Sequence, residues 1–294
     1  MYEGIRSPAI HTPRSVSEFI SAAAHYPNAV IWAGGTYIMG RPNYYPSEDN
    51  TDIIYLGEIA ELKKITRNDR FIEIGSMVTA SQLLNAGKLV LSDVLLDTLS
   101  SLASRIVRRQ VTIGGSLCTP DIRLSLPGSL AVLDAIVEVK QIQGNKTTNR
   151  WIPISRLYDK DGQLLLNGTN LITKIRIGLE SGNFQRFRVI DSPVLNPQQC
   201  VIFAFQCTRG QSAVSKAHFC FTFPTAGFHI SRELETQLSG QPLPMPPQRI
   251  NRLSFALTSE IHKLHPLVTD LQLERSRRMF EAVFHDLNTE VLEE

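Results

Sequence analysis

The sequence of 294 residues lacks several features that would assign a class at once. It has no run of about 20 apolar residues, and residues 1–14 lack the apolar core of a signal peptide, so we expect no transmembrane segment and a cytoplasmic protein. Basic and acidic residues nearly balance, at 30 Lys and Arg against 28 Asp and Glu. Without a concentrated basic surface, the composition gives no basis for binding nucleic acid.

Patterns for metals and nucleophiles are also missing. The four cysteines form no CxxC pair and the seven histidines no HxxxH or His-Glu pair, so no metal site is expected. Serine, histidine and aspartate occur in no nucleophile-elbow arrangement, so no catalytic side chain is predicted. In a reducing compartment the cysteines are expected to be free thiols.

Apolar residues recur at spacings that predict a mixture of short strands and helices. Helices are predicted over residues 15–26, 79–86, 95–107, 130–135 and 270–287, and strands over 29–33, 52–56, 62–65, 71–74, 111–113, 136–142, 172–177, 201–206 and 218–223. In the helix over 95–107 the apolar stripe includes Ala103 and Ile106. The strands from residue 172 onward predict a small antiparallel sheet, and residues 241–248, with four prolines, a linker-like loop.

A first glycine loop follows the predicted strand over 29–33. It consists of Ala33, Gly34, Gly35, Thr36, Tyr37 and Ile38. Glycine lets a backbone bend sharply and approach a ligand closely, and successive N–H groups in such a bend suit a pyrophosphate. The loop is neither a Walker loop nor a Rossmann GxGxxG, and a plain turn is the alternative interpretation.

A second glycine loop, residues 108–118, lies about 80 residues further on and includes the predicted strand over 111–113. It contains Thr112, Gly114, Gly115 and Ser116. A β-turn with a buried threonine would explain this loop alone. Two such loops, each with a nearby hydroxyl, suggest one ligand held from both sides.

At these loops the sequence resembles the FAD-binding medium subunits of the molybdenum hydroxylases, the xanthine dehydrogenase and carbon monoxide dehydrogenase family. The first loop resembles the family's first flavin motif, and VTIGGSLC at residues 111–118 resembles its second, A-T-I-G-G-N-L-C. The segments 52–62, 72–79 and 130–135 resemble further family segments in the same order. The resemblance covers residues 5–180 well and is thin beyond.

The resemblance implies an α+β chain with a vanillyl-alcohol-oxidase-type (PCMH-type) FAD-binding fold. It implies an FAD-binding domain over residues 1–180, with subdomains of about 1–57 and 58–180. Residues 181–294 would form a C-terminal α+β domain similar to that of the carbon monoxide dehydrogenase flavoprotein, with a small antiparallel sheet.

The resemblance also implies partners and a reaction. A molybdopterin-binding large subunit and a two-iron–two-sulfur small subunit would pass electrons to FAD, which would hand them to NAD or another acceptor. The chain would then be a subunit of an FAD-dependent oxidoreductase, active in the complex. The substrate of the complex stays open, with a purine preferred.

Cofactor-binding residues are carried over by position. They are the six residues of the first loop, then Arg108, Thr112, Gly114, Gly115, Ser116, Cys118, Asp121, Ser125, Ile172 and Arg186. Ile172 matches an apolar position near the flavin ring. Arg186 falls where the family often has a lysine, a cation that would favour reduced, anionic flavin.

The sequence departs from the family pattern at two polar positions. Ser116 replaces the asparagine after the glycine pair, and Ser125 stands where the family has an aspartate for a cofactor hydroxyl, although Asp121 lies four residues earlier. A serine hydroxyl bonds more weakly than a carboxylate. Two alternatives therefore stay open: a degenerate family member that has lost FAD and acts as a structural or assembly subunit, and a stand-alone flavin oxidase.

Overall fold

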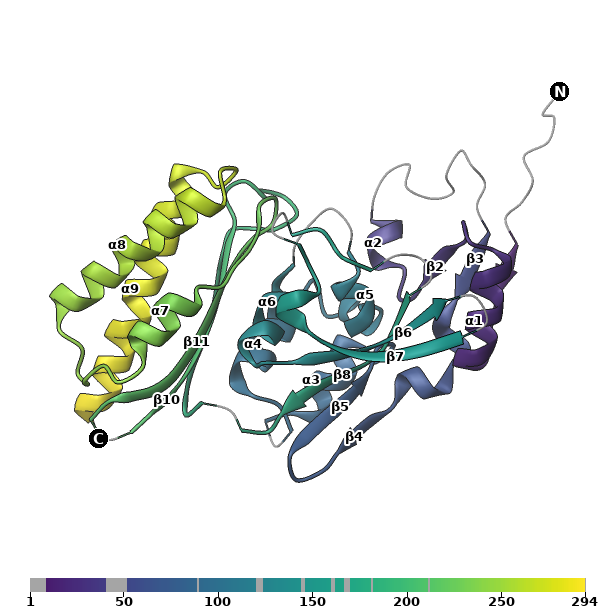
Figure 1. Cartoon of the computed structure of the whole chain (residues 1–294), viewed down its shortest axis with the longest axis horizontal. Helices are drawn as coiled ribbons and strands as arrows, with labels where there is room; N and C mark the ends of the chain where they lie inside the picture. The colour runs from purple at the N-terminus through teal and green to yellow at the C-terminus, as the bar shows by residue number, and fades with distance from the viewer. Residues whose placement is uncertain are drawn as a thin grey trace.

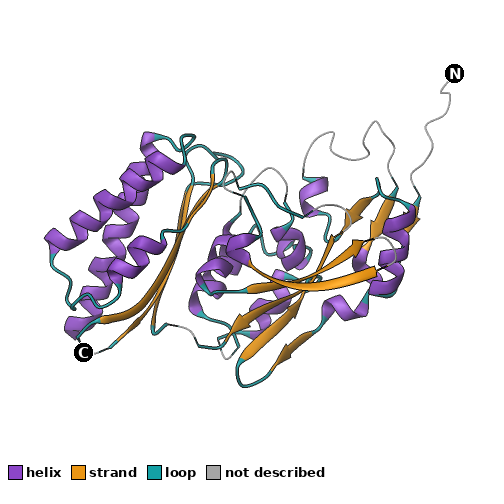
Figure 2. Cartoon of the chain, in the orientation of Figure 1, coloured by secondary structure: helices purple, strands orange, loops and turns teal. Residues whose placement is uncertain are grey.

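A computed structural model describes residues 9–40, 52–88, 90–119, 124–143, 146–159, 162–166, 170–180, 182–210 and 212–293. Three β-sheets follow one another along the long axis of the molecule, each accompanied by helices (Figures 1 and 2). This mixture of helix and sheet agrees with the α+β class expected from the sequence. Within the described ranges, no helix combines the length and apolar character needed to cross a membrane.

The first sheet is small and parallel. Its strands are β1 (Ile10–His11), β3 (Ile53–Tyr55) and β2 (Val30–Trp32), in the order β1-β3-β2. Helix α1 (Val16–His25) begins after Ser15, whose hydroxyl accepts a hydrogen bond from the Glu18 N–H at 3.1 Å. Phe19 of this helix is fully buried in a cluster with Ile54, which fixes α1 on the sheet.

The second sheet is antiparallel and has five strands. They are β4 (Ile65–Arg67), β5 (Phe71–Gly75), β8 (Asn170–Gly178), β6 (Ile136–Gln143) and β7 (Lys146–Pro153), in that spatial order. The accompanying helices are α3 (Ala80–Ala86), α4 (Asp93–Ser101), α5 (Ile113–Leu117) and α6 (Ser125–Val132). Ile175 and Ile177 of β8 pair with isoleucines of β5 and are buried in the core between sheet and helices.

The third sheet has four antiparallel strands. They are β12 (Gly227–His229), β11 (Val214–Phe223), β10 (Val201–Arg209) and β9 (Phe184–Ile190). Helices α7 (Arg232–Leu238), α8 (Pro247–Leu264) and α9 (Asp270–Glu293) cover one face, while α4 and α6 pack on the other (Figure 1). Because both faces are covered, the central strands read as almost continuous apolar runs.

Several sequence predictions were wrong. The helix expected over 95–107 is α4 and ends at Ser101; Ala103 then has a φ of 45° and Ile106 is 80% exposed, because the chain turns there. Residues 62–65 form no single strand, since a 3₁₀ turn (Ala60–Lys63) precedes β4. The strand expected over 172–177 is part of β8 and belongs to the second sheet, not to the C-terminal one.

The C-terminal part contains two helices that the sequence patterns did not predict, α7 and α8. Helix α8 begins at Pro247, so the proline-rich segment ends in a helix. Leu243 and Met245 of that segment are buried in the C-terminal core, so it is not a free linker. Pro at a first helical position is favourable because its missing N–H has no intrahelical partner there.

Candidate cofactor-binding site

The two glycine loops lie in direct contact, although about 80 residues separate them in sequence. A Cβ atom added to Gly34 would stand 1.9 Å from the carbonyl oxygen of Gln110, two residues before Thr112. A Cβ added to Gly115 would stand 3.6 Å from the Cβ of Ala33. Only glycine at position 34 allows this approach, so the first loop is fitted against the second.

The first loop joins strand β2 to the short helix α2 (Thr36–Met39). Gly35 has a φ of 70°, a left-handed conformation that favours glycine, and a Cβ there would also meet the ring of Trp32 at 2.6 Å. The first helical hydrogen bond runs from the Met39 N–H to the Gly35 carbonyl. The N–H groups of Thr36 and Ile38 precede this bond at the start of the helix, where backbone donors can bind an anion.

In the second loop, the backbone N–H groups have acceptors within the protein. The N–H groups of Ile113 and Gly114 donate to the Val78 and Ser76 carbonyls at 3.0 and 2.8 Å. The Gly115 N–H donates to the Thr112 hydroxyl at 3.1 Å. These hydrogen bonds fix the backbone of the second loop, so its N–H groups are not available to bind a ligand.

The expected strand over 111–113 is therefore wrong: Thr112 caps helix α5, which contains both glycines. Three β-branched or apolar residues in a row, VTI, indicate a strand by composition. Here, bonds to the segment that follows β5 fix them as a helix start instead.

Two buried hydroxyls at the second loop form no hydrogen bond with any described residue. Ser116 is 6% exposed and Ser76 4%, and the Oγ atom of each lacks a partner. A buried hydroxyl without a partner costs about 1–3 kcal/mol, which a bound polar group can recover. Two such hydroxyls next to the glycines of the second loop could form hydrogen bonds with a polar ligand such as FAD. Ser76 was not predicted as a site residue; its only sequence signal is a polar residue directly after the buried strand β5.

The other predicted site residues are placed as follows. Arg108 donates to the carbonyl oxygens of Leu99 (3.4 Å) and Ser100 at the end of α4, so it anchors that helix next to the second loop. Cys118 is exposed at the end of α5. Ser125 and Ile172 are buried, in α6 and β8, and Ile172 packs within the core of the second sheet. Asp121 lies outside the described residues.

Arg186 is not brought together with the glycine loops. Its guanidinium pairs with Asp286 (3.3 Å) and Glu290 of helix α9. The neighbouring Gln185 points to the opposite face of β9, where its side-chain oxygen accepts from the Val94 N–H of α4 at 3.0 Å. Arg188 and Arg209 share these two carboxylates, so the arginine belongs to an ion-pair cluster on the face of the sheet that α9 covers.

No group of acidic, histidine or cysteine side chains in the described ranges could hold a metal ion. The site offers backbone donors from the first loop, closely packed glycines in the second, and two buried hydroxyls, of Ser76 and Ser116, beside the second loop. These are features of a nucleotide cofactor site, with no side chain placed for acid–base chemistry.

Comparisons with known proteins agree with this description. The sequence model of the family "FAD binding domain in molybdopterin dehydrogenase" matches residues 5–179. The xanthine dehydrogenase FAD-binding subunit of Escherichia coli O157:H7 is 24% identical over 164 residues, covering 55% of this chain and 54% of that protein. Probable aldehyde oxidase 3 of Oryza sativa subsp. japonica is 28% identical over 216 residues, 67% of this chain. The chain spans only 15% of that relative's length.

A solved structure extends the likeness to the whole chain. A chain of the reconstituted CO dehydrogenase from Oligotropha carboxidovorans superposes with a TM-score of 0.77 and 18% identity, covering 98% of this chain and 97% of that one. At this identity the comparison shows the fold alone. It includes the third sheet and its helices, which the family match does not reach.

Proposed function

We propose that this chain, which belongs to the family of FAD-binding domains of molybdopterin dehydrogenases, is the FAD-carrying electron-transfer subunit of a molybdenum hydroxylase complex. A molybdopterin-binding subunit and a two-iron–two-sulfur subunit would be its partners, and NAD or another oxidant its electron acceptor. The substrate would be oxidised on the molybdopterin subunit. The fold proposed is the PCMH-type arrangement, with subdomains of about 1–57 and 58–180 and a C-terminal domain over 181–294.

One observation carries the proposal: the fit of the two glycine loops against each other at Gly34 and Gln110. Glycines far apart in sequence have a reason to meet when they form the two walls of one cofactor site. The first loop would hold the pyrophosphate through the N–H groups of Thr36, Tyr37 and Ile38. The second would support the cofactor with the backbone at Gly115 and the hydroxyl of Ser116.

When bound, FAD would supply the redox chemistry, taking up and releasing electrons at its isoalloxazine ring. The side chains of this chain would only bind, orient and shield it. The two hydroxyls without partners, on Ser116 and Ser76, would each gain a hydrogen bond from the cofactor or from a water beside it.

The proposal is tested by titrating the purified chain with FAD and following flavin fluorescence. Saturable quenching at a one-to-one ratio, with a yellow protein after gel filtration, is the expected result. Coexpression with the neighbouring genes and mass spectrometry of the copurified chains would identify the partners. A chain that is folded by circular dichroism, binds no FAD and still copurifies with them would establish the structural-subunit alternative instead.

A further inference from the structure

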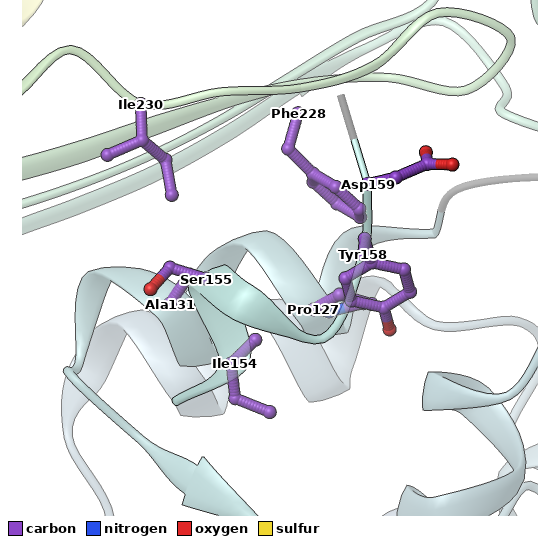
Figure 3. Close-up of a pocket in the computed structure, with 8 residues that line it drawn as sticks. All are labelled: Pro127, Ala131, Ile154, Ser155, Tyr158, Asp159, Phe228 and Ile230. Carbon is purple, nitrogen blue, oxygen red and sulfur yellow. The ribbon is translucent and has the colours of Figure 1, made fainter. Parts of the chain in front are cut away.

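A cavity lies apart from the glycine loops, between helix α6 and the edge strand β12 of the third sheet (Figure 3). It has a volume of about 260 Å³. Phe228 and Ile230 enter it from the sheet side, and the other lining residues enter from the side of α6. Those residues are Pro127, Ala131, Ile154, Ser155, Tyr158 and Asp159.

The lining fits a small, flat molecule that has both apolar and polar parts. Proline, alanine and isoleucine side chains provide apolar walls, and the rings of Tyr158 and Phe228 stand 4.9 Å apart at a tilt of 48°. Aromatic rings favour an aromatic guest because offset and edge-to-face contacts add to area burial. An apolar cavity of about 150 Å³ is enough for benzene, so this one has room for two fused rings.

The polar groups set the charge and the orientation of the guest. The Ser155 hydroxyl belongs to the lining and is exposed, so it can accept a hydrogen bond from a hydroxyl or N–H on the guest. The carboxylate of Asp159, which accepts from the Gln163 N–H at 2.7 Å, is exposed at the rim. Its negative charge disfavours anionic guests.

Tyr158 connects this cavity to the second glycine loop. Its hydroxyl donates to the carbonyl oxygen of Leu117, the last residue of α5, at 2.8 Å. Tyr158 is 9% exposed, so this bond is shielded from water. A guest packed on Tyr158 and Phe228 would hold the tyrosine ring in place and, through the bond, the end of the helix that carries Gly114 and Gly115.

We propose that this cavity binds a small uncharged aromatic molecule bearing a hydroxyl or N–H donor, and that its occupancy strengthens cofactor binding at the second glycine loop through Tyr158. Binding to the cavity is independent of the proposed function, whereas the coupling rests on it. Coupling between two sites is reciprocal, so FAD would tighten binding of the aromatic molecule by the same factor.

Binding is tested on the full chain with 2-naphthol as the probe and isoleucine δ1-methyl labelling for NMR. The methyl signals of Ile154 and Ile230 should shift saturably, while that of Ile65, in strand β4, stays in place. The anion 2-naphthoate should bind about tenfold more weakly, because of Asp159. Shifts absent up to the solubility limit, or confined to other methyl groups, would overturn the site.

Two matched variants make the location decisive. Ser155→Trp should fill the mouth of the cavity and abolish the shifts, whereas Arg156→Trp, on the same exposed turn but outside the lining, should leave them unchanged. Melting temperatures of both variants close to that of the wild type would show that the turn tolerates the ring. Equal loss in both variants would refute the assignment to this cavity.

The coupling has its own readout, the FAD dissociation constant with and without saturating 2-naphthol. We expect it to fall about fivefold in the wild type and to stay constant in Tyr158→Phe, which keeps the ring and loses the bond to Leu117. A constant value in both proteins would refute the coupling and leave the cavity standing. Failure to bind FAD at all would refute the proposed function and the coupling together, while the NMR result would still decide the cavity.

Discussion

Gly34→Ala is the sharpest perturbation of the proposed cofactor site. The added Cβ would stand 1.9 Å from the Gln110 carbonyl oxygen, and real Cβ atoms essentially never approach within 3.0 Å. The loops must therefore separate by at least 3.0 − 1.9 = 1.1 Å. Since Gln110 contributes a backbone atom, no side-chain rotation can relieve the overlap.

The consequences follow from this displacement. Overpacking of this kind costs about 1–3 kcal/mol of unfolding free energy. A displacement of about 1 Å between groups that hold one ligand costs on the order of 100-fold in its effectiveness. We therefore expect Gly34→Ala to lower the stability measured by urea unfolding by about 1–3 kcal/mol and to weaken FAD binding by about 10- to 100-fold.

Gly178→Ala is the matched control, because a Cβ there meets nothing within 4 Å. It should change stability by no more than about 0.5 kcal/mol and leave FAD binding intact. Flavin fluorescence titration of wild type and both variants gives the comparison. Wild-type affinity and stability in Gly34→Ala would refute the claim that the two loops are fitted walls of one site.

Three further predictions concern individual side chains. Thr112→Val removes the hydroxyl that accepts a hydrogen bond from the Gly115 N–H. Urea unfolding should show an unfolding free energy lower by about 1 kcal/mol, and the FAD titration should show weaker binding. Ser116→Ala removes a hydroxyl that bonds to no described residue. Stability should stay within about 0.5 kcal/mol, and only FAD affinity should fall. Burial and the nearby His265 lower the pKa of His229 from 6.5 to about 3. The folded protein therefore keeps this histidine neutral, whereas the unfolded chain takes up a proton below pH 6.5. Stability should thus fall as the pH drops from 6.5 towards 3, by about 2 kcal/mol at pH 5; urea unfolding of His229→Asn should show a flatter acid limb, and equal slopes would contradict this.

Sequence patterns predicted the first glycine loop better than the second for a physical reason. The first loop follows β2, and its bend is made by Gly35 in the left-handed conformation, so local sequence is sufficient to predict the bend. The second loop depends on bonds from its N–H groups to carbonyls of the segment after β5, about 35 residues away. These tertiary hydrogen bonds outweigh the strand preference of Val111 and Thr112. They cannot be predicted from the residues around the loop alone.

The C-terminal part shows what local patterns can and cannot do. Helix α8 has a detectable pattern, since Ile250, Leu253, Leu257 and Ile261 recur every three or four residues and are all buried. The prolines just before it indicate a loop and conceal the helix start. The two faces of β10 look alike in sequence because helices cover both, so composition cannot say which face meets which layer.

The same limit applies to the cation expected beside the cofactor. Alternation along β9 establishes that Gln185 and Arg186 point to opposite faces of the sheet. Which face each side chain occupies is decided by its tertiary partners: Val94 of α4 bonds to Gln185, and Asp286 and Glu290 of α9 pair with Arg186. Asp286 also pairs with Arg188, and Glu290 with Arg209, so this ion-pair cluster holds Arg186 on the α9 side of the sheet. The described residues on the α4 side of β9 are Gln185, Phe187 and Val189, none of them cationic, so this strand presents no cation towards α4.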